Sequence, residues 1–442
     1  MTEAAARTAM SGAAPSSDMP VLVAGDDDPA GCRLLPGPAS VPGWRGHLEQ
    51  HGPLPQATPE AIVRAVEASG LTGRGGAGFP TAQKMRAVAA GAGPRVVVGN
   101  GAEGEPASAK DKALLVAAPH LVLDGLQVAA RAVGAGQAYL YVKQHSLVHE
   151  VIRRALRERL EARSDVLPVT LVTAPVGFVS GEESAVASRV SGGPALPQPK
   201  PPRVFEAGVH GRPTMVSNVE TLAHLALIAR HGAEAFREVG HREQPGRMLF
   251  TVSGAERTTV VEAPVGTTLG SIVAAAGGPA EETSAVLLGG YHGGWLHWPG
   301  ASGLEMSNPV LRPMGLAVGA GVAILLPASV CGVEESARVL SYLADESAGQ
   351  CGHCVFGMPK LADAFGLAAA GRSRRGRRRI ADLSELLERR GGCSHPDGTL
   401  RFMRSAVDVF ADELRLHGEG RCSAASTRRL LPTPRAGSRV RA

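Results

Sequence analysis

The sequence has few aromatic residues, few cysteines and no long hydrophobic run. Phe, Trp and Tyr make up 4% of its 442 residues, whereas Gly occurs 56 times and Pro 32 times. Hydrophobic residues reach 44% and charged residues 20%, which is typical of a globular protein. A chain of this length can form about two or three domains around a sizeable core, so we expect a folded protein rich in tight turns.

No segment is typical of a membrane span or of a secretory signal. The longest apolar run, Gly315 to Ser329, is too short to span a membrane and contains glycines and Pro327. Residues 1–19 lack an apolar core segment. We therefore expect a cytoplasmic protein without direct membrane insertion, either free or peripheral to a membrane complex.

The basic residues are concentrated in two blocks. The formal net charge is +5, but one block of arginines runs from Arg372 to Arg379 and another from Arg428 to Arg441. Such a surface predicts an acidic protein partner, and a solvated loop is the simpler alternative. We expect no nucleic-acid partner.

The six cysteines are Cys32, Cys331, Cys351, Cys354, Cys393 and Cys422. In a cytosolic chain a Cys-x-x-Cys pair is more typical of metal or redox chemistry than of a structural disulfide. Cys351 and Cys354 form such a pair and can bind one metal ion or cluster, with Cys393 as the third candidate ligand. Cys32 stands alone, and we expect a free surface thiol there.

A Gly-rich stretch from Gly70 to Thr81 follows a predicted helix at Pro59–Ser69 and precedes another helix that carries Lys84. Glycine lets the backbone approach a ligand, and successive N–H groups can bind an anion. Arg74 and Lys84 add positive charge that suits a phosphate. A flexible surface loop is the alternative.

Strands and long helices alternate through the first half of the chain. We predict strands at 95–98, 138–142 and 169–174 and helices at 119–133 and 147–162. This alternation favours a parallel, layered α/β domain, in which the turn after the first strand, Asn100–Pro106, can contact a ligand. The adjacent Glu182 and Glu183 open a later helix, where they either cap it or present a carboxylate to a ligand.

Residues 247–300 change character. A predicted ββαβ unit there is followed by a strand at 322–326 and, from Val333, by helices that include 380–389 and 400–416. The resulting domain limits are 1–45 (disordered or draped), 46–240 (α/β), 241–330 (small β domain), 331–422 (helical) and 423–442 (disordered basic tail).

Together these segments resemble the NADH-binding flavoprotein subunit of respiratory complex I and the diaphorase subunits of NAD-linked hydrogenases and formate dehydrogenases. The resemblance runs in order from about Pro59 to His417. The matching motifs are Gly73–Thr81, Asn100–Pro106, Gly181-Glu182-Glu183, Lys200-Pro201-Pro202, Asn218–Leu222 and Glu346–Cys351.

The resemblance implies an oxidoreductase that binds FMN on the Gly-rich loop, accepts hydride from NADH and passes single electrons to a 4Fe–4S cluster. It implies a Rossmann-like FMN-binding domain, a ubiquitin-like β-grasp (SLBB-like) domain and a helical bundle that holds the iron–sulfur site. It also implies catalytic roles for Glu103 and Glu183. The cofactor-binding residues that it implies are Gly73, Arg74, Gly75, Gly76, Phe79, Lys84, Asn100, Glu103, Gly104, Gly181, Glu182, Glu183, Lys200, Ser217, Asn218 and Thr221, and the metal ligands are Cys351, Cys354 and Cys393.

One departure from the family affects the cluster. The family has a Cys at the position of Ala348, so one of the four thiolates of a 4Fe–4S cluster is missing. Cys422 or His395 could substitute. The alternatives are a cluster with an unusual fourth ligand, a zinc ion, and no metal.

Other departures affect nucleotide binding. Ala102, Gly104 and Ser217 shorten hydrogen-bonding side chains of the family pattern, and Arg203 stands where the family has an aromatic ring. We expect NAD(P)H as the donor and a protein acceptor, such as a ferredoxin or a reductase component of a multi-subunit complex. The alternatives are a non-catalytic relay or assembly subunit and a zinc-stabilised scaffold.

Overall fold

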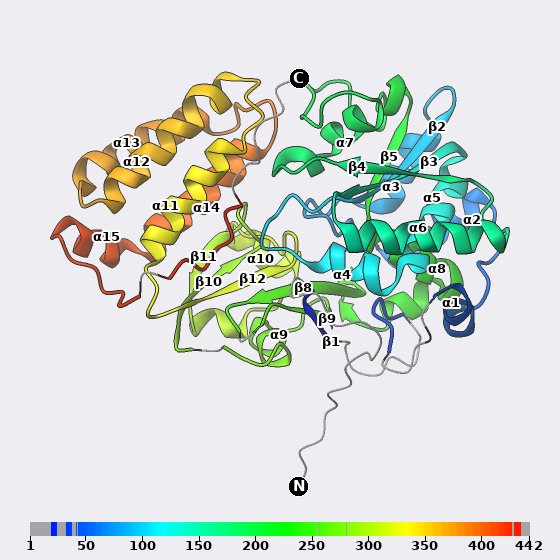
Figure 1. Ribbon diagram of the computed structural model, residues 1–442, viewed down its shortest axis with the longest axis horizontal. Coiled ribbons are helices and arrows are strands. Elements are labelled where there is room, and N and C mark those ends of the chain that lie inside the picture. Colours follow the sequence, from blue (N-terminus) through cyan, green and yellow to red (C-terminus); the bar gives the residue numbers. More distant parts are fainter. Residues whose placement is uncertain are drawn as a thin grey trace, which may run out of the picture.

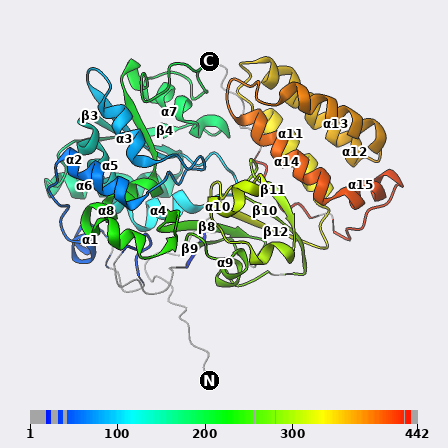
Figure 2. The same ribbon diagram turned by 180° about the vertical axis from the view of Figure 1, so that it is seen from behind.

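The computed structural model combines an α/β half, a mixed β-sheet and a bundle of C-terminal helices (Figure 1). It describes residues 19–23, 32–37, 41, 43–255, 257–279, 281–426 and 428–434. The view from behind in Figure 2 shows the same arrangement, with the C-terminal helices and the α/β half on either side of the mixed sheet.

The first sheet has four parallel strands in the order β4-β3-β2-β5. They are β2 (Arg95–Gly101), β3 (Ala135–Lys143), β4 (Val169–Ala174) and β5 (Thr214–Asn218). Successive side chains of a strand point to opposite faces, so Val97 enters one core cluster while Val96 and Val98 enter another. The predicted parallel α/β layer is therefore present.

Helices cover both faces of this sheet. The helix α5 is almost wholly buried, including its polar residues His120, Asp124 and Gln127. Thr58 caps α2 by accepting from the N–H of Ala61, and Gly70 ends it with φ = +71°, as the sequence predicted. The helices of this half are α1 (Gly43–His51), α2 (Pro59–Ser69), α3 (Thr81–Ala89), α4 (Lys110–Ala117), α5 (Pro119–Val133), α6 (Ser146–Glu161), α7 (Glu183–Val190) and α8 (Val219–Arg237).

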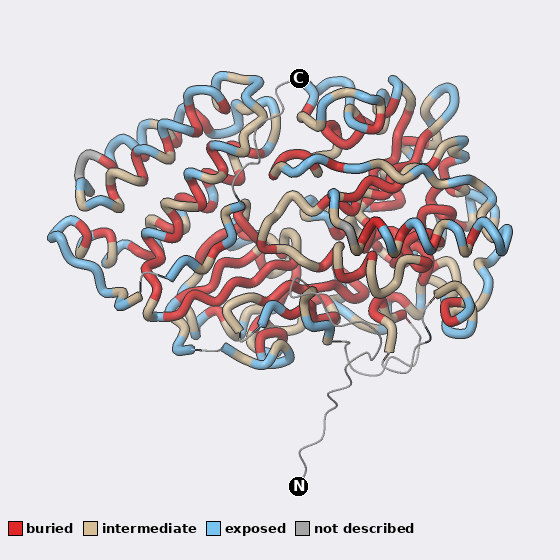
Figure 3. Tube along the Cα trace, viewed as in Figure 1, coloured by how far each residue is buried: buried red, intermediate tan, exposed pale blue. Residues whose placement is uncertain are grey.

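The second sheet is mixed and has six strands in the order β1-β9-β8-β12-β10-β11. They are β1 (Val21–Val23), β8 (Arg247–Ser253), β9 (Thr259–Pro264), β10 (Thr283–Leu288), β11 (Gly294–His297) and β12 (Val322–Pro327). Val286 and Leu288 pack on the face that carries α9 (Leu269–Ala275), while Leu287 and Ile324 pack against the C-terminal helices. Figure 3 accordingly shows the inner strands of this sheet, β9, β8, β12 and β10, mostly buried.

The C-terminal helices pack through large apolar residues such as Leu343 and Phe365. Helix α13 begins before Ile380 and includes the arginine block, and the helix predicted for 400–416 is two helices that meet at Phe410. The elements are α11 (Gly332–Asp345), a π-helix (His353–Gly357), α12 (Met358–Ala369), α13 (Ser373–Leu387), α14 (His395–Val409) and α15 (Ala411–Gly418).

The N-terminal segment corrects two expectations. Its residues 21–23 form β1, which pairs in parallel with β9, so the segment is not merely draped. The carboxylate of Glu262 in β9 accepts hydrogen bonds from the N–H groups of Leu34 at 2.8 Å and Leu35 at 2.9 Å. Cys32, expected at the surface, is 2% exposed. The remaining residues of 1–45 up to Gly43 lie mostly outside the described ranges.

The C-terminal segment also differs from the expected disordered tail. The N–H groups of Leu430 and Leu431 donate to Glu335 in α11, and the hydroxyl of Tyr291 donates to the carbonyl of Pro432 at 2.7 Å. Arg428, part of the second basic block, pairs with Glu281. Residues 423–426 and 428–434 therefore pack against the protein, and residues 435–442 lie outside the described ranges.

Within the described ranges no single helix is long and apolar enough to cross a membrane, and only α4 and α5, bent by 97° relative to each other, pass such a test as a pair.

Candidate functional site

The Gly-rich loop is a closed turn between α2 and α3. Gly73 N–H donates to the carbonyl of Phe79 at 2.9 Å, and Thr81 N–H donates to the carbonyl of Leu71 at 3.0 Å. Inside this closure Gly76 has φ = +111° and Gly78 has φ = +65°, conformations that other residues rarely adopt. The backbone of this stretch is therefore held in one conformation by its own hydrogen bonds, which does not fit the alternative of a flexible surface loop.

This loop lies on the N-terminus of α8. Arg74 N–H donates to the hydroxyl of Thr221 at 2.9 Å, and a side chain at Gly75 would meet Asn218 at 3.1 Å. Asn218 caps α8 by accepting from the N–H of Glu220. A glycine loop against a helix N-terminus is a favourable place for a phosphate, because backbone N–H groups and the helix dipole both favour an anion.

The Arg74 side chain is 1% exposed, and it is only partly hydrogen-bonded. One terminal nitrogen donates to the carbonyl of Pro245 at 2.9 Å, while Nε and Nη1 have no partner among the described residues. Burial lowers the pKa of Arg74, and nearby Glu220 partly offsets this. Unpaired buried donors beneath the glycine loop fit an anionic cofactor group there.

Next to the loop lies a buried ionic network that the sequence did not reveal. Lys110 Nζ lies 2.8 Å from Asp111 and 2.7 Å from Glu220, and Asn218 donates to Asp111 at 2.6 Å. Burial works to lower the pKa of Lys110, but the two carboxylates outweigh it and raise the pKa. The network fixes the start of α4 against the start of α8, and thereby fixes Asn218.

The turn after β2 is held by close backbone contacts. Asn100 donates from its side chain to the carbonyl of Gly181 at 2.9 Å, and the N–H of Ala102 donates to Asn100 at 3.2 Å. A Cβ at Gly104 would lie 2.1 Å from the carbonyl oxygen of Phe178. The serine of the family pattern therefore has no room here unless the backbone shifts.

Glu103 turns toward α4. Its carboxylate accepts from the hydroxyl of Ser108 and from the N–H groups of Asp111 at 3.0 Å and Lys112 at 3.3 Å. Burial, followed by the charge of Asp111, raises the pKa of Glu103. In this arrangement the residue supports the start of α4, and the catalytic role expected for it stays a prediction.

The two glutamates at α7 have different surroundings. Glu182 caps the helix by accepting from the N–H of Ser184 at 2.8 Å, and it also pairs with Lys200 at 2.9 Å. Glu183 pairs with Lys84 at 3.2 Å, with about a third of its side chain exposed. Glu182 thus follows the capping interpretation, whereas Glu183 is partly exposed and pairs with Lys84 of α3, the helix that follows the glycine loop.

The remaining expected residues lie in β5, in α3 and in the glycine loop. Ser217, in β5, is buried and pairs in register with Gly99 of β2. Lys84 also donates to the carbonyl of Val216 at 3.0 Å, which holds α3 to β5. Phe79 is 47% exposed, so its ring is free to stack on a ligand. These side chains, with Glu183, fit a flavin phosphate and a planar ring system.

The cysteines form a second candidate site. The sulfurs of Cys351 and Cys354 are 3.7 Å apart, at the start of a π-helix. Burial works to raise the pKa of the Cys351 thiol, but backbone N–H groups, that of Gly392 first, outweigh it and lower the pKa to about 7. Burial and then the charge of Cys354 raise the pKa of Cys393, which faces both. The three thiols are therefore neighbours, and their role as metal ligands stays a prediction.

Neither proposed substitute reaches the fourth position. His395 is fully engaged, since its Nε2 lies 2.8 Å from the carbonyl of Leu343 and its Nδ1 lies 3.0 Å from His292. Cys422 lies beside Cys331, at the opposite end of α11 from the cluster residues. Fourteen helical residues separate those ends by about 21 Å. The suggestion that Cys422 is a cluster ligand is therefore wrong, and Ala348 leaves three thiols for the cluster.

Phe178 connects the two candidate sites. Its N–H donates to Glu346 at 2.8 Å, just before the cysteines, and its ring contacts His395 at 5.4 Å. The charge of Glu182 acts on Cys393 across the same boundary. The segment that leads into α7 therefore packs against the region of the thiols.

Comparison with known proteins defines the class first: residues 66–227 match the model of the Nuo51 FMN-binding domain, and residues 334–417 match that of the NADH-ubiquinone oxidoreductase-F iron–sulfur binding region. The chain is 32% identical to the F 2 subunit of the NADH-quinone oxidoreductase of Rhizobium meliloti, over 91% of this chain and 98% of that protein. The chain therefore belongs to the family of NADH-quinone oxidoreductase F subunits.

The chain is also similar to components of two hydrogenases. The HndC subunit of the NADP-reducing hydrogenase of Solidesulfovibrio fructosivorans is 28% identical over 81% of this chain and 76% of its own length. A chain of an NAD+-reducing NiFe hydrogenase superposes with a TM-score of 0.73 at 32% identity, covering 81% of this chain and 63% of that one. FMN and a 4Fe–4S cluster are the cofactors that the matched regions bind, and NADH fits the family as the substrate.

Proposed function

We propose that this protein oxidises NAD(P)H at a bound FMN and passes the electrons through an iron–sulfur cluster at Cys351, Cys354 and Cys393 to a protein acceptor. The observation that carries the proposal is the contact of Phe178 with both Glu346 and His395, which joins the flavin region to the thiols. Transfer of single electrons requires such proximity. When bound, FMN supplies the step from hydride to single electrons.

Within this proposal each part of the chain has one task. Residues 46–240 form a Rossmann-like domain for FMN, 241–330 form a β-grasp domain that buttresses it, and 331–422 form the helical domain of the cluster. The loop at Gly75 and Gly76, on the N-terminus of α8, binds the FMN phosphate, and Arg74 adds positive charge beneath it. Phe79 and Glu183 face the nicotinamide nucleotide, and Lys84 holds Glu183 in place.

The acceptor is proposed to be an acidic protein, such as a ferredoxin or a reductase component of a multi-subunit complex. Arg378 and Arg379 are exposed on α13, which packs beside α12 of the helical bundle. A positively charged helix near an electron exit steers an acidic partner and speeds association at low salt.

The test is anaerobic reconstitution of the full chain with FMN, iron and sulfide, followed by addition of NADH or NADPH. Bleaching of the flavin absorbance by either nucleotide, then reduction of the cluster, is expected. Gly76→Ala places a side chain at φ = +111° in the loop and should weaken FMN binding at least tenfold. Gly315→Ala introduces comparable strain at φ = +74° with open space around it, and should leave FMN binding unchanged.

Two outcomes count against the proposal. A folded protein that retains no FMN contradicts the flavin site. A protein that retains FMN and iron but is bleached by neither nucleotide favours instead a non-catalytic relay or assembly subunit. The residues Ala102, Gly104 and Arg203 favour that second candidate, because they replace hydrogen-bonding side chains or an aromatic ring of the family pattern.

A further inference from the structure

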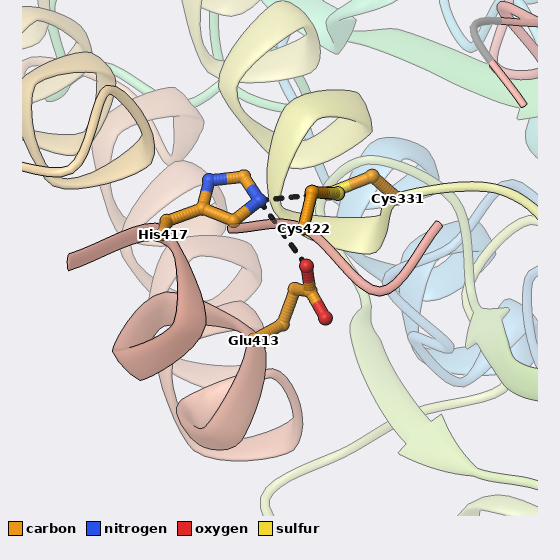
Figure 4. A group of neighbouring side chains, drawn as sticks. All are labelled: Cys331, Glu413, His417 and Cys422. Atoms are coloured by element: carbon orange, nitrogen blue, oxygen red, sulfur yellow. Dashed lines mark hydrogen bonds and ion pairs between the residues drawn. The ribbon is translucent and has the colours of Figure 1, made fainter. Parts of the chain in front are cut away.

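A second constellation of metal-ligating side chains lies at the far end of the helical bundle. It consists of Cys331, Glu413, His417 and Cys422, whose ligand atoms all lie within 4.8 Å of one another (Figure 4). The four come from the N-terminus of α11, from α15 and from the segment that follows α15. None of them takes part in the proposed electron transfer.

The separations match those that a tetrahedral ion imposes. The sulfur of Cys331 lies 3.5 Å from Nε2 of His417, and that nitrogen lies 3.2 Å from Oε1 of Glu413. Around zinc, with Zn–S near 2.3 Å and Zn–N and Zn–O near 2.1 Å, the S···N distance is about 3.6 Å and the N···O distance is about 3.4 Å. Cys422 completes the set by contacting both Cys331 and Glu413.

Outer hydrogen bonds orient two of the four side chains. Nδ1 of His417 donates to the carbonyl of Ala369 at 2.6 Å, and Nε2 is directed at the sulfur of Cys331 and the carboxylate of Glu413. Glu413 accepts from the N–H of Ser423 at 2.9 Å and from the Ser423 hydroxyl. Bonds of this kind to a carbonyl behind the histidine and to the ligating carboxylate are typical of metal sites.

We propose that Cys331, Glu413, His417 and Cys422 bind one zinc ion that serves a structural role. Two sulfurs, one imidazole nitrogen and one carboxylate oxygen form a set that suits zinc, and the protein itself fills every tetrahedral position. A closed site leaves no place for a substrate or an activated water. Two thiols are also too few for an iron–sulfur cubane.

The electrostatic surroundings agree with such a site. Cys331 is the N-cap of α11, where the helix dipole favours the negative charge of a thiolate.

The ion would anchor the end of the chain. Cys422 begins the segment that runs back along the bundle, where Ser426 pairs with Val330 and Leu431 is buried. Through these four ligands, the ion would join the start of α11 to α15 and to the segment that follows α15. The proposed site is about 21 Å from the cluster thiols, the length of α11, so its occupancy can be measured separately from theirs.

The experiment is metal analysis of the full chain, purified under reducing conditions, reconstituted with iron and sulfide at the other site and then loaded with zinc. About one zinc per chain is expected, and Cys422→Ser, His417→Gln and the double variant should retain less than about a tenth of it. Cys351→Ser serves as the matched control, because it removes a thiol of the other site and should leave the tightly bound zinc unchanged. X-ray absorption at the zinc edge should show two sulfur neighbours in the wild type.

Folding is checked independently, by circular dichroism and by iron uptake at the other site. Cys422 is exposed, so its replacement by Ser should preserve both. The proposal is overturned if the wild type binds no zinc, if zinc persists in the folded double variant, or if mass spectrometry finds Cys331 and Cys422 joined in a disulfide that reductant and zinc do not replace.

Discussion

The backbone N–H of Phe178 and the carboxylate of Glu346 are joined by a hydrogen bond of 2.8 Å between residues that are 168 positions apart in the chain. Phe178 stands just before Gly181, and Glu346 just after α11 and before Cys351. The bond thus joins the segment before α7, in the flavin region, to the segment before the thiols.

Glu346→Ala should slow electron passage from flavin to cluster while leaving nucleotide oxidation nearly intact. The variant leaves the Phe178 N–H without its acceptor, at a cost of about 1–3 kcal/mol in the contact, and lets the two regions separate. Stopped-flow spectroscopy would follow flavin bleaching and cluster reduction separately. Glu346→Gln keeps an acceptor oxygen and should behave like the wild type; equal slowing in both variants would contradict the role given to the bond.

Ala348→Cys should increase the iron that the protein retains. Residue 348 stands where the family has a cysteine, and three thiols already converge nearby, so a fourth completes the set that a 4Fe–4S cluster prefers. Iron and sulfide per chain, with the electron paramagnetic resonance spectrum after reduction, give the measurement. Ala348→Ser is the control of equal size. Identical iron content in the two variants would mean that residue 348 does not face the cluster.

Lys110→Met should destabilise the protein by about 3–5 kcal/mol, because it leaves two buried carboxylates without their cation. The side chains of Lys110 and Glu220 are 2% and 0% exposed, so water cannot replace the lost partner. Chemical denaturation would give the difference. Lys360→Met, on the exposed side of α12, should cost less than about 0.5 kcal/mol. A loss below about 1 kcal/mol for Lys110→Met would contradict a tightly coupled network.

Glu262→Gln should flatten the pH dependence of stability between pH 5 and pH 8. Burial raises the pKa of Glu262 from 4.5 to about 7, so in that interval the folded state holds a proton that the unfolded state has released. The stabilisation is complete below pH 4.5 and is lost as the pH rises through 7. The loss amounts to about 3 kcal/mol at most.

Calorimetry at several pH values would compare how the free energy of unfolding changes with pH in the wild type and in Glu262→Gln. A constant difference in stability introduced by the amide does not affect the comparison of the two slopes. Parallel curves would show that Glu262 is already ionised in the folded protein. Glu282→Gln, on the exposed turn before β10, provides the control that should leave the slope unchanged.

Local signals in the sequence predicted the elements that depend on local chemistry. Thr58, Pro59 and Gly70 fixed both ends of α2, and the period of apolar residues fixed α5. The strands β5 and β11 were not among the predicted strands. Both strands gain their hydrogen bonds from partners far away in the chain, which periodicity cannot reveal.

The candidate site divides in the same way. The glycine loop and the three cysteines carry recognisable motifs, so the sequence alone could single them out as candidate sites. Lys110, Asp111 and Glu220 have no motif, because their significance comes from a shared burial that only the fold creates. Cys422 was considered as a possible fourth cluster ligand for a related reason, since the sequence does not show that α11 separates it from the cluster thiols.

The position of β1 at the rim of the second sheet bears on how the protein should be handled. Shortening the chain to begin at residue 43 would strip β9 of its outer neighbour and leave a row of backbone groups open to pairing with another molecule. It would also leave the Glu262 carboxyl without Leu34 and Leu35. A recombinant protein that begins at residue 43 should therefore precipitate more readily than one that keeps residues 1–42.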